Sequence, residues 1–427
     1  MYDQSYHYDS ILKMIKNSDY DKVPFLYKSS EKKGFVERAV ISANSNFGGL
    51  NPLNVFTLNG KQIYRFAKYE DELVVRKACR NIKGLINYTA PNRDDIVLNL
   101  RFLLSEGIPY TVYRLDVKSF YESFNSNLIV DTINSIEKAN PQTKSILSSL
   151  MREYSIGGGL GLPRGLAFSA VMSEVLMKNF DDGLKNTQGV YFYARYIDDI
   201  IIITNPLNNQ NEFISYIIKE LTSLGLSLNN KKRKIASIQK KIAPIPIATY
   251  LAAPPKALLS IDYLGYNFKV YEPQEIKKLS GLTKKQFRDV VTDISASKIK
   301  RYKSRIVKSF LDYLLNKNFL LLMMRLKFLT SNFSIKDKDS EKLKMTGIYY
   351  NYPRITTFDG LKEMDKFHKN AILCNTGRLF SKTSLLLNKR FRSFLLKQTF
   401  QHGHKNRIFL YFNAYDLKQI QECWKYD

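Results

Sequence analysis

The chain has 427 residues, enough for about two or three domains, and its 44% hydrophobic content excludes a mainly disordered protein. Subtracting 39 Asp and Glu from 66 Lys and Arg leaves a net charge of +27, which favours a polyanion such as nucleic acid as partner. No apolar run reaches the ~20 residues that span a bilayer, and the first ten residues lack a signal-peptide pattern. The three cysteines are too scattered for a disulfide framework. We therefore expect a cytoplasmic protein with no membrane partner.

From Tyr113 onward, predicted strands and helices alternate. A short apolar strand ends at Asp116, two more cover 191–196 and 200–204, and a further strand covers 263–270. Helices are expected over 127–137, 142–153, 166–180 and 212–224. This β-α-β-β-α-β order indicates an α+β fold with an antiparallel sheet backed by helices. After Glu272 the sequence becomes mostly helical and strongly basic, with a boundary expected near 272–290.

One predicted helix in this basic region, over Lys298–Phe310, has two distinct faces. The charged face is formed, at three- and four-residue steps, by Lys298, Arg301, Arg305 and Lys308. The apolar face is formed by Ile299, Tyr302, Ile306 and Phe310. We expect the apolar face to pack on the protein and the charged face to bind nucleic-acid phosphates. The alternative is a charged face that is only solvated.

Adjacent aspartates occur three times, and their flanking residues separate the cases. Asp94-Asp95 stands where a helix would begin, so helix capping explains it. Asp181-Asp182 precedes Gly183, where we expect a helix to end in a turn. Asp198-Asp199 lies between two apolar strands and marks a tight hairpin, where buried charge is costly unless cations neutralise it. The alternative for this last pair is an acidic turn at the surface.

A further acid, Asp116, ends the strand that begins near Tyr113. If the two acid-bearing strands are neighbours, Asp116 and Asp198 face each other across the sheet. Carboxylate oxygens in this arrangement suit Mg²⁺, which keeps several waters and binds substrate phosphates. Two such ions, ~3.5–4 Å apart, can activate a 3′-hydroxyl and stabilise a leaving pyrophosphate.

Five short segments follow one another in an order that is typical of one enzyme family. LDVKSFY at 115–121, the Gly/Pro-stiffened loop GLPRGLAFS at 161–169 and YIDD at 196–199 resemble motifs A, B and C of the reverse transcriptases. Gly225–Lys232 and Tyr263–Tyr266 resemble motifs D and E. The resemblance covers about residues 70–270, and it is the order and spacing of all five segments that make it specific.

The resemblance implies a right-hand polymerase with fingers, palm and thumb. We expect the N-terminal region and fingers in 1–110, a palm in 111–270 with a further fingers portion at about 125–160, a thumb in 271–345 and a helical C-terminal region in 346–427. It also implies an RNA-directed DNA polymerase that uses two Mg²⁺ ions, with Mn²⁺ as an alternative. The implied partners are an RNA template, dNTPs and the DNA product, together with a second protein or further copies of the chain.

The family's catalytic residues are carried over by position. Asp116 and Asp198 are the expected ligands of both metal ions, and the Val117 carbonyl is a further ligand. Asp199 is the adjacent catalytic acid, engaged more weakly. One residue departs from the family pattern, because Arg164 stands where motif B usually has a Gln near the nascent base pair.

The resemblance also implies substrate-binding residues. Tyr121 falls where the family places a steric gate against the ribose 2′-hydroxyl; its alternative role is that of an aromatic core residue. Lys232 falls near the motif D lysine that approaches the pyrophosphate, with Lys231 and Lys234 as competitors. Guanidinium groups match phosphate oxygens, and the candidates for holding the triphosphate are Arg76, Arg80 and Arg93.

Within the family, the amino-acid sequence around motifs A and C is most similar to that of the bacterial defence-associated, or antiphage, reverse transcriptases. Among these it is most similar to the smaller polymerase of the type 3 system. This resemblance implies copying of a non-coding RNA. The alternatives are a retron- or intron-type reverse transcriptase, an RNA-dependent RNA polymerase and a catalytically silent RNA-binding scaffold. No zinc module, endonuclease or RNase H segment is recognisable, and His402-Gly403-His404 is expected to lie in a loop.

Overall fold

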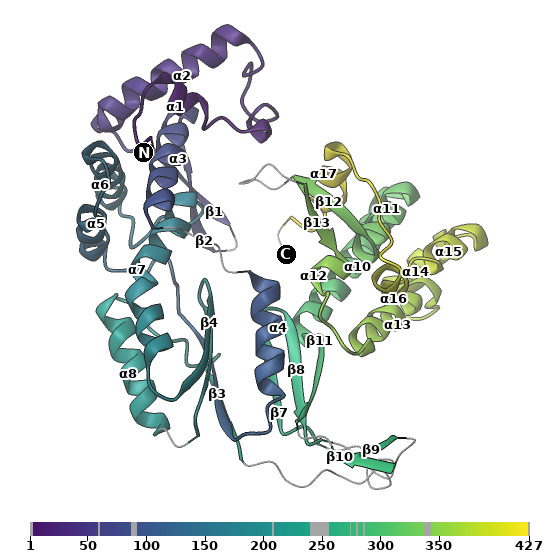
Figure 1. Ribbon diagram of the computed structural model, residues 1–427. Helices are drawn as coiled ribbons and strands as arrows, with labels where there is room; N and C mark the ends of the chain where they lie inside the picture. The colour runs from purple at the N-terminus through teal and green to yellow at the C-terminus, as the bar shows by residue number, and fades with distance from the viewer. Residues whose placement is uncertain are drawn as a thin grey trace. The chain divides into compact units, whose positions relative to one another are not determined.

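The computed structural model describes residues 3–58, 60–86, 92–206, 209–239, 256–273, 275–278, 281–284, 287–336 and 343–425. The chain folds into two compact units (Figure 1). Unit 1 contains Met1–Asn92 and Tyr110–Ser237, and unit 2 contains Arg93–Pro109 and Ile238–Asp427. The chain therefore passes from one unit to the other three times. The division into fingers, palm and thumb stays a prediction.

Unit 1 is built on a four-stranded sheet with the strand order β4-β5-β3-β6. The strands cover Tyr110–Asp116 (β3), Val190–Tyr196 (β4), Asp199–Thr204 (β5) and Lys234–Ile238 (β6). β5 pairs antiparallel with both β3 and β4. Its four consecutive isoleucines, Ile200–Ile203, are all buried, as expected of a central strand whose β-branched side chains pack on both faces of the sheet.

Helices pack around this sheet and enclose a single large hydrophobic core. Three of them begin after an asparagine whose side-chain oxygen accepts backbone N–H groups of the first turn, namely Asn125, Asn140 and Asn209. The helices of unit 1 cover Tyr8–Leu12 (α1), Ser29–Asn44 (α2), Tyr69–Leu85 (α3), Ser126–Ser135 (α5), Pro141–Ile156 (α6), Ala167–Asn186 (α7) and Gln210–Ser223 (α8). Short 3₁₀ turns at Asn17–Asp19 and Asn46–Gly49 and a hairpin of Leu53–Leu58 (β1) and Lys61–Phe66 (β2) complete the unit.

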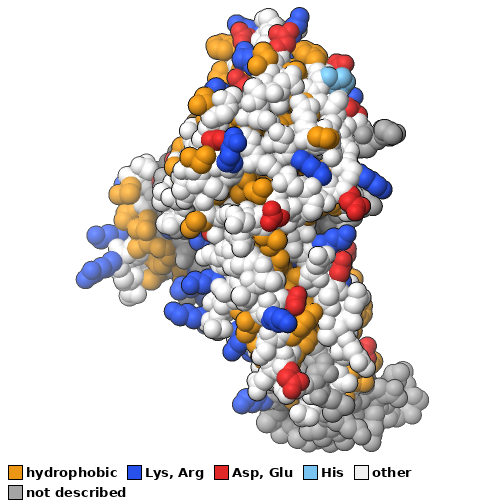
Figure 2. Space-filling model, turned by 90° about the vertical axis from the view of Figure 1, so that its left-hand side faces the viewer, with side chains coloured by type: hydrophobic (Ala, Val, Ile, Leu, Met, Phe, Trp, Pro, Cys, Tyr) orange, Lys and Arg blue, Asp and Glu red, His pale blue; other side chains and the backbone are white. Residues whose placement is uncertain are grey.

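The face of unit 1 formed by α5, α6 and α8 carries charges of both signs. Figure 2 views the molecule from this side and shows Lys and Arg side chains interspersed with Asp and Glu. On α8, for example, Glu212, Lys219 and Glu220 occur within two and a half turns. The large excess of positive charge is therefore not gathered into one patch on this face.

Unit 2 combines a three-stranded antiparallel sheet, in the order β11-β8-β7, with a set of helices. Its strands cover Leu259–Tyr263 (β7), Tyr266–Tyr271 (β8) and Asp289–Ile294 (β11), and two hairpins pair Glu275–Lys278 (β9) with Gly281–Lys284 (β10) and Asn332–Lys336 (β12) with Leu343–Gly347 (β13). Its helices cover Arg93–Leu104 (α4), Ala296–Asn316 (α10), Phe319–Thr330 (α11), Ile348–Asn351 (α12), Asp359–Leu373 (α13), Phe380–Leu386 (α14), Lys389–Leu396 (α15), Phe400–Lys405 (α16) and Ala414–Glu422 (α17).

Helix α4 is tied into unit 2 by polar contacts at both ends. At its start, Arg93 donates hydrogen bonds to the backbone carbonyls of Leu264 and Asn351 at 2.7–3.0 Å. Beyond its end, the buried guanidinium of Arg288 donates to the carbonyls of Glu106 and Ile108. The residues that hold α4 therefore come from the part of unit 2 that lies much later in the chain.

The structure confirms the predicted α+β fold with antiparallel sheets and corrects three local expectations. The single strand expected over 263–270 is a hairpin, because Leu264 and Gly265 form a two-residue turn with positive φ angles of 48° and 82°. Gly183 does not end α7, which continues to Asn186. Residues 402–404 lie in α16 instead of a loop. The region after Glu272 is mostly helical, as expected, and its described residues also form the strands β9 to β13.

Helix α10 has the two faces that its sequence predicts. Ile299, Ile306 and Phe310 are buried, and Tyr302 is half-buried. On the other face Arg301 is exposed, while the other three predicted cations are half-buried. Nowhere in the described ranges is a helix both long and apolar enough to cross a bilayer.

Burial of His368 should make unit 2 sensitive to acid. This α13 side chain is 2% exposed, and burial lowers its pKa from 6.5 to about 4. The unfolded chain binds the proton near pH 6.5, whereas the folded chain does so only near pH 4, so stability is lost as the pH falls through this window. We expect this group to cost about 2 kcal/mol of stability on going from about pH 8 to about pH 5.

Urea denaturation of the wild type and of His368→Leu at both pH values checks this expectation. The variant can differ in absolute stability, but its loss of stability on acidification should be smaller than that of the wild type by about 2 kcal/mol. Equal losses in the two proteins would contradict the assignment.

Candidate active site

The three predicted acids meet at one end of two neighbouring strands. Asp116 is the last residue of β3, and it lies opposite Asp199, the first residue of β5. The backbone N–H of Val117 donates to the carbonyl oxygen of Asp198 at 3.0 Å. Strand pairing thus brings the acid of the LDVKSFY segment next to both acids of the YIDD segment.

The turn that carries Asp198 is strained. Tyr196 pairs with Asp199, so Ile197 and Asp198 alone form the turn between β4 and β5. Ile197 has a φ of 60°, a left-handed conformation that a β-branched residue rarely adopts. Two-residue hairpins usually place Gly or Asn at such a position, and the strain costs about 1–3 kcal/mol. The surrounding structure must therefore hold this turn in place.

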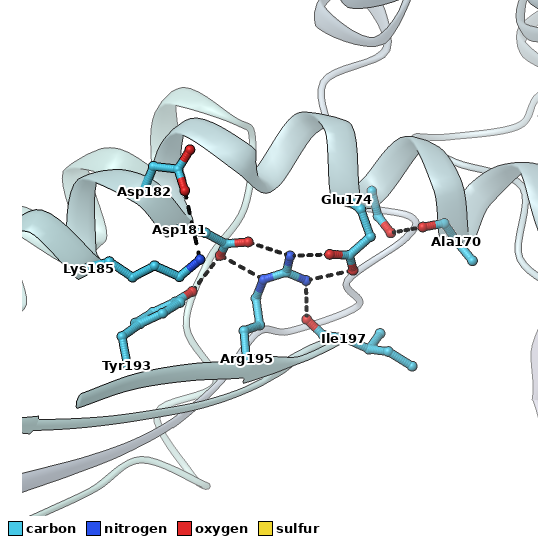
Figure 3. A network of polar contacts seen from close by, with 9 residues as sticks. Ala170, Glu174, Asp181, Asp182, Lys185, Tyr193, Arg195 and Ile197 are labelled. Carbon is cyan, nitrogen blue, oxygen red and sulfur yellow. Dashed lines mark hydrogen bonds and ion pairs between the residues drawn. The ribbon is translucent and has the colours of Figure 1, made fainter. Parts of the chain in front are cut away.

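A buried ion network ties the turn to α7 (Figure 3). The side chain of Arg195 is 3% exposed, and it donates to the carbonyl oxygen of Ile197 at 3.1 Å. Its remaining hydrogen bonds go to Glu174, at 2.8 and 3.1 Å, and to Asp181, at 2.7 and 2.8 Å. Burial acts to lower the pKa of Arg195, but the two acids outweigh it and raise that pKa. The guanidinium therefore stays charged and fixes the turn backbone relative to the helix.

Loss of this guanidinium should destabilise unit 1 strongly. In Arg195→Met, Glu174 and Asp181 would keep their partly buried charges without a cation, which costs about 3–5 kcal/mol. A matched control is Lys185→Met on α7, the helix that carries Glu174 and Asp181. Lys185 forms an exposed ion pair with Asp182 at 3.8 Å, which contributes less than about 1 kcal/mol to stability. Urea unfolding measures both variants. Equal effects of the two substitutions would show that the network does not hold the fold.

Two basic side chains bind the acids directly. The Nζ of Lys232 lies 2.7 Å from a carboxylate oxygen of Asp116, and the amide of Asn229 donates to the other oxygen at 3.1 Å. Arg114 donates to Asp199 at 2.8 Å and to the backbone carbonyl of Lys232. These contacts offset part of the repulsion among the acids, and they place Lys232 at the centre of the site.

The remaining repulsion fits a site built for cations. Burial raises the pKa of Asp198 and of Asp199, and the charge of Asp116 adds to the increase at both. Carboxylates and a backbone carbonyl such as that of Val117 are the hard oxygen donors that Mg²⁺ prefers. Within the described ranges no three His, Cys, Asp or Glu side chains form a ready-made metal cluster, and Asp199 is bound to Arg114. The oxygen donors present therefore fit a hard cation such as Mg²⁺.

The predicted Gly/Pro-rich loop packs between β2 and the residues that follow β3. The N–H of Leu162 donates to the carbonyl of Tyr121 at 2.7 Å, and the N–H of Tyr64 donates to the carbonyl of Arg164 at 2.8 Å. Gly161 has a φ of 60°, and a Cβ there would lie 2.4 Å from the Tyr121 carbonyl oxygen. Only glycine fits this approach, so the loop is locked against the segment that carries Tyr121.

Arg164 forms a bidentate ion pair with Glu122, with hydrogen bonds of 2.5 and 2.9 Å. The bonds to Glu122 are the main cause of the raised pKa of Arg164, and the charge of Asp198 contributes as well. The guanidinium carbon of Arg164 lies 5.5 Å from the ring centroid of Tyr121, whose ring also packs edge-on against Phe120. Tyr121 is thus half-buried between a cation and a core aromatic, a placement compatible with either of its predicted roles.

The three arginines predicted to hold a triphosphate have different surroundings. Arg76, on α3, is 16% exposed and binds Asp19 and Glu72 at 2.5–2.6 Å, contacts that tie it to the fold of unit 1. Arg80 is exposed on the same helix. Arg93 begins α4 and belongs to unit 2. The three residues therefore do not belong to one unit, and of the two in unit 1 only Arg80 is exposed.

Arg114, Glu122 and Arg195 were not among the residues predicted from the sequence. A signal for Arg114 existed, because side chains two residues apart on a strand share a face and Arg114 precedes Asp116 by two. Glu122 binds a residue 42 positions away, and Arg195 binds acids 14 and 21 positions away. No local pattern encodes such contacts, which depend on tertiary packing.

Comparison with known families supports the resemblance of the motifs. Residues 77–268 match the family described as "Reverse transcriptase (RNA-dependent DNA polymerase)". The matched segment is similar to that family and covers less than half of the chain. This segment contains all three acids and the Arg164 loop, and its antiparallel sheet with surrounding helices agrees with the right-hand polymerase fold of RNA-directed DNA polymerases.

Among solved structures, the chain is similar to apo telomerase from Candida tropicalis truncated from the C-terminal domain, with 12% identity and a TM-score of 0.32. The match covers 60% of this chain and 49% of the telomerase chain, so this chain spans about half of that protein. A likeness this weak supports no argument about function. No curated protein matches the chain.

Proposed function

We propose that the chain adds deoxynucleotides to the 3′ end of a primer paired with an RNA template. The observation that carries this proposal is the meeting of Asp116 with Asp198 and Asp199 at the paired ends of β3 and β5, inside a segment that matches the reverse transcriptases. Two Mg²⁺ ions, with Mn²⁺ as an alternative, would supply charge neutralisation at the attacking and leaving oxygens when bound.

The protein's own residues have distinct parts in this proposal. Asp116 and Asp198 hold the cations, with the carbonyl of Val117 as a further ligand, and Asp199 is the adjacent acid that Arg114 keeps in place. Lys232 is 55% exposed and already contacts Asp116, so its ammonium group can reach a phosphate that enters the site. Of the three triphosphate candidates, Arg80 is the one whose side chain is exposed.

Asp116→Asn and Asp198→Asn should each abolish incorporation of labelled dNTP in the presence of Mg²⁺. Each variant removes a charge that the cations need but keeps the shape of the side chain and relieves repulsion among the acids, so the fold should stay largely intact. RNA binding should be unchanged. Incorporation assays, melting curves and RNA binding assays check the three expectations.

A matched control for these variants is Asp182→Asn, the same substitution at an exposed acid of α7 that lies outside the site. It should leave incorporation at the wild-type level. Near-normal synthesis by Asp116→Asn or Asp198→Asn would remove the basis of the proposed function.

We further propose that Tyr121 excludes the ribose 2′-hydroxyl and that Arg164 positions its ring. Tyr121→Ala should increase the use of rNTPs relative to dNTPs by about one to two powers of ten, the range expected when a close contact to one small group is lost. Arg164→Gln, which restores the residue usual in motif B, should shift the ratio in the same direction by less. An unchanged ratio in Tyr121→Ala would assign Tyr121 to the core.

We also propose that the template is a non-coding RNA and that the product serves bacterial antiphage defence, with a second protein or further copies of the chain as partners. The defence role is supported by the amino-acid sequence of motifs A and C, and a nucleic-acid partner is supported by the net charge of +27. Sequencing of the RNA and DNA that copurify with the protein tests the template. A retron- or intron-type enzyme would carry its own characteristic RNA, and a silent scaffold would carry RNA without DNA.

A further inference from the structure

In unit 2, basic side chains gather around two cavities beside helix α10. The first, of about 340 Å³, lies between α10, the start of α4 and the segment Asn351–Tyr352. The second, of about 530 Å³, lies between α10, α11 and α17. Arg301 and Arg305 line both cavities, so the two spaces meet at this pair of side chains.

The first cavity has a strongly positive lining. Its basic side chains are Arg93, Lys298, Arg301 and Arg305, and no acid belongs to the described residues that line it. Arg93 is held rigidly, since three of its five N–H groups bind carbonyls of Leu264 and Asn351 and its guanidinium lies 4.9 Å from the ring centroid of Tyr266. The nearby acid Asp94 forms a bidentate ion pair with Arg354, which binds both of its carboxylate oxygens. A cavity of this kind attracts an anion.

The second cavity adds cations from the C-terminal helix. Lys418 and Lys425, both exposed, line it together with Arg301 and Arg305, and one acid, Glu422, is present. Trp424 fixes this end of the chain to α10, because its indole N–H donates to the backbone carbonyl of Arg305 at 3.0 Å. Trp424 is 4% exposed and is one of the residues that line the cavity.

The fourth cation predicted on α10, Lys308, lines neither cavity. The sequence pattern groups Lys308 with Lys298, Arg301 and Arg305 along one face of the helix. The cavities instead group the other three with Arg93 on one side and with Lys418 and Lys425 on the other. The cations that line the cavities thus extend from α10 to α4 on one side and to α17 on the other.

We propose that the two cavities bind consecutive phosphates of one nucleic-acid strand, which crosses α10 at Arg301 and Arg305. This inference rests on the proposed function and adds Arg93, Lys418 and Lys425 to the residues that bind nucleic acid. Cavities of this size admit a nucleotide-sized group, and guanidinium forks match phosphate oxygens. Contacts made to phosphates alone carry no sequence information, so the site holds any strand.

Two variants separate a path across α10 from a path along it. The double variant Lys418→Gln with Lys425→Gln removes two cations of the second cavity. The variant Lys308→Gln removes a cation that belongs to the predicted charged face of α10 but lines neither cavity. Lys300→Gln, at an exposed position of α10 that lines neither cavity, is the control. The probe is a labelled single-stranded RNA of about 20 nucleotides and mixed sequence, with anisotropy measured from about 50 to about 200 mM salt.

Each phosphate contact contributes ~0.7–0.9 to the slope of log affinity against log salt. Over this fourfold range of salt, each lost contact should reduce the fall in affinity by a factor of about three. The fold-loss of affinity between low and high salt should therefore be about ten times smaller in the double variant than in the wild type. Lys308→Gln and Lys300→Gln should keep the wild-type slope, and all variants should keep the wild-type melting temperature.

Wild-type affinity and slope in the double variant would overturn the proposal, and so would an equal loss of slope in Lys308→Gln. A labelled mononucleotide that binds as tightly as the RNA would show a nucleotide pocket instead of a strand path, and would overturn it as well. All binding is measured on the Asp116→Asn background without dNTPs. A failure of incorporation by the wild type would therefore contradict the proposed function without affecting this test.

Discussion

The close placement of three like charges, one buried and two half-buried, where two neighbouring strands end is the constraint on which the candidate site depends. Asp116 is 3% exposed and directly opposite Asp199, so a single register shift between β3 and β5 would separate the acids and turn every side chain of the strand over. The buried isoleucines of β5 fix that register through the core. The same apolar packing that stabilises the sheet therefore also determines where the acids lie, and the basic side chains around them reduce the repulsion that this arrangement creates.

The network around Arg195 adds a second constraint of a different kind. Replacement of a buried ion network by well-packed apolar side chains often leaves stability unchanged or raises it. The contribution of this network therefore lies in placement more than in stability. It binds the carbonyl of Ile197 in a conformation that the residue alone would avoid, and it takes both of its acids from one rigid helix. The position of Asp198 thus depends on α7 as much as on its own strands.

Local sequence patterns predicted the elements of unit 1 from β3 to α8, because most of these helices are amphipathic and three begin at asparagine caps. They did not predict the individual elements before β3, nor β6. They also predicted the hairpin at Asp198-Asp199, since two adjacent acids interrupt an otherwise continuous apolar run and cannot both be buried in a strand without cations. They failed at Leu264-Gly265, where a turn lies inside an apolar run, and at Gly183, where packing of α7 overrides the low helix propensity of glycine. Contacts such as Glu122 with Arg164 or Trp424 with α10 join segments that are distant in the sequence, so the periodicity of apolar residues within one segment cannot predict them.

The threading of the chain through two units has a consequence for its synthesis. Helix α4 leaves the ribosome early, yet Arg93 at its start hydrogen-bonds to Asn351, 258 residues later. At about 5–20 residues per second, its partners follow only after roughly tens of seconds. During that interval the apolar side of α4, formed by Val97, Leu100 and Leu104, has nothing to cover it from its own unit. The apolar side of α4 can therefore be covered by its own unit only after most of the chain has been translated.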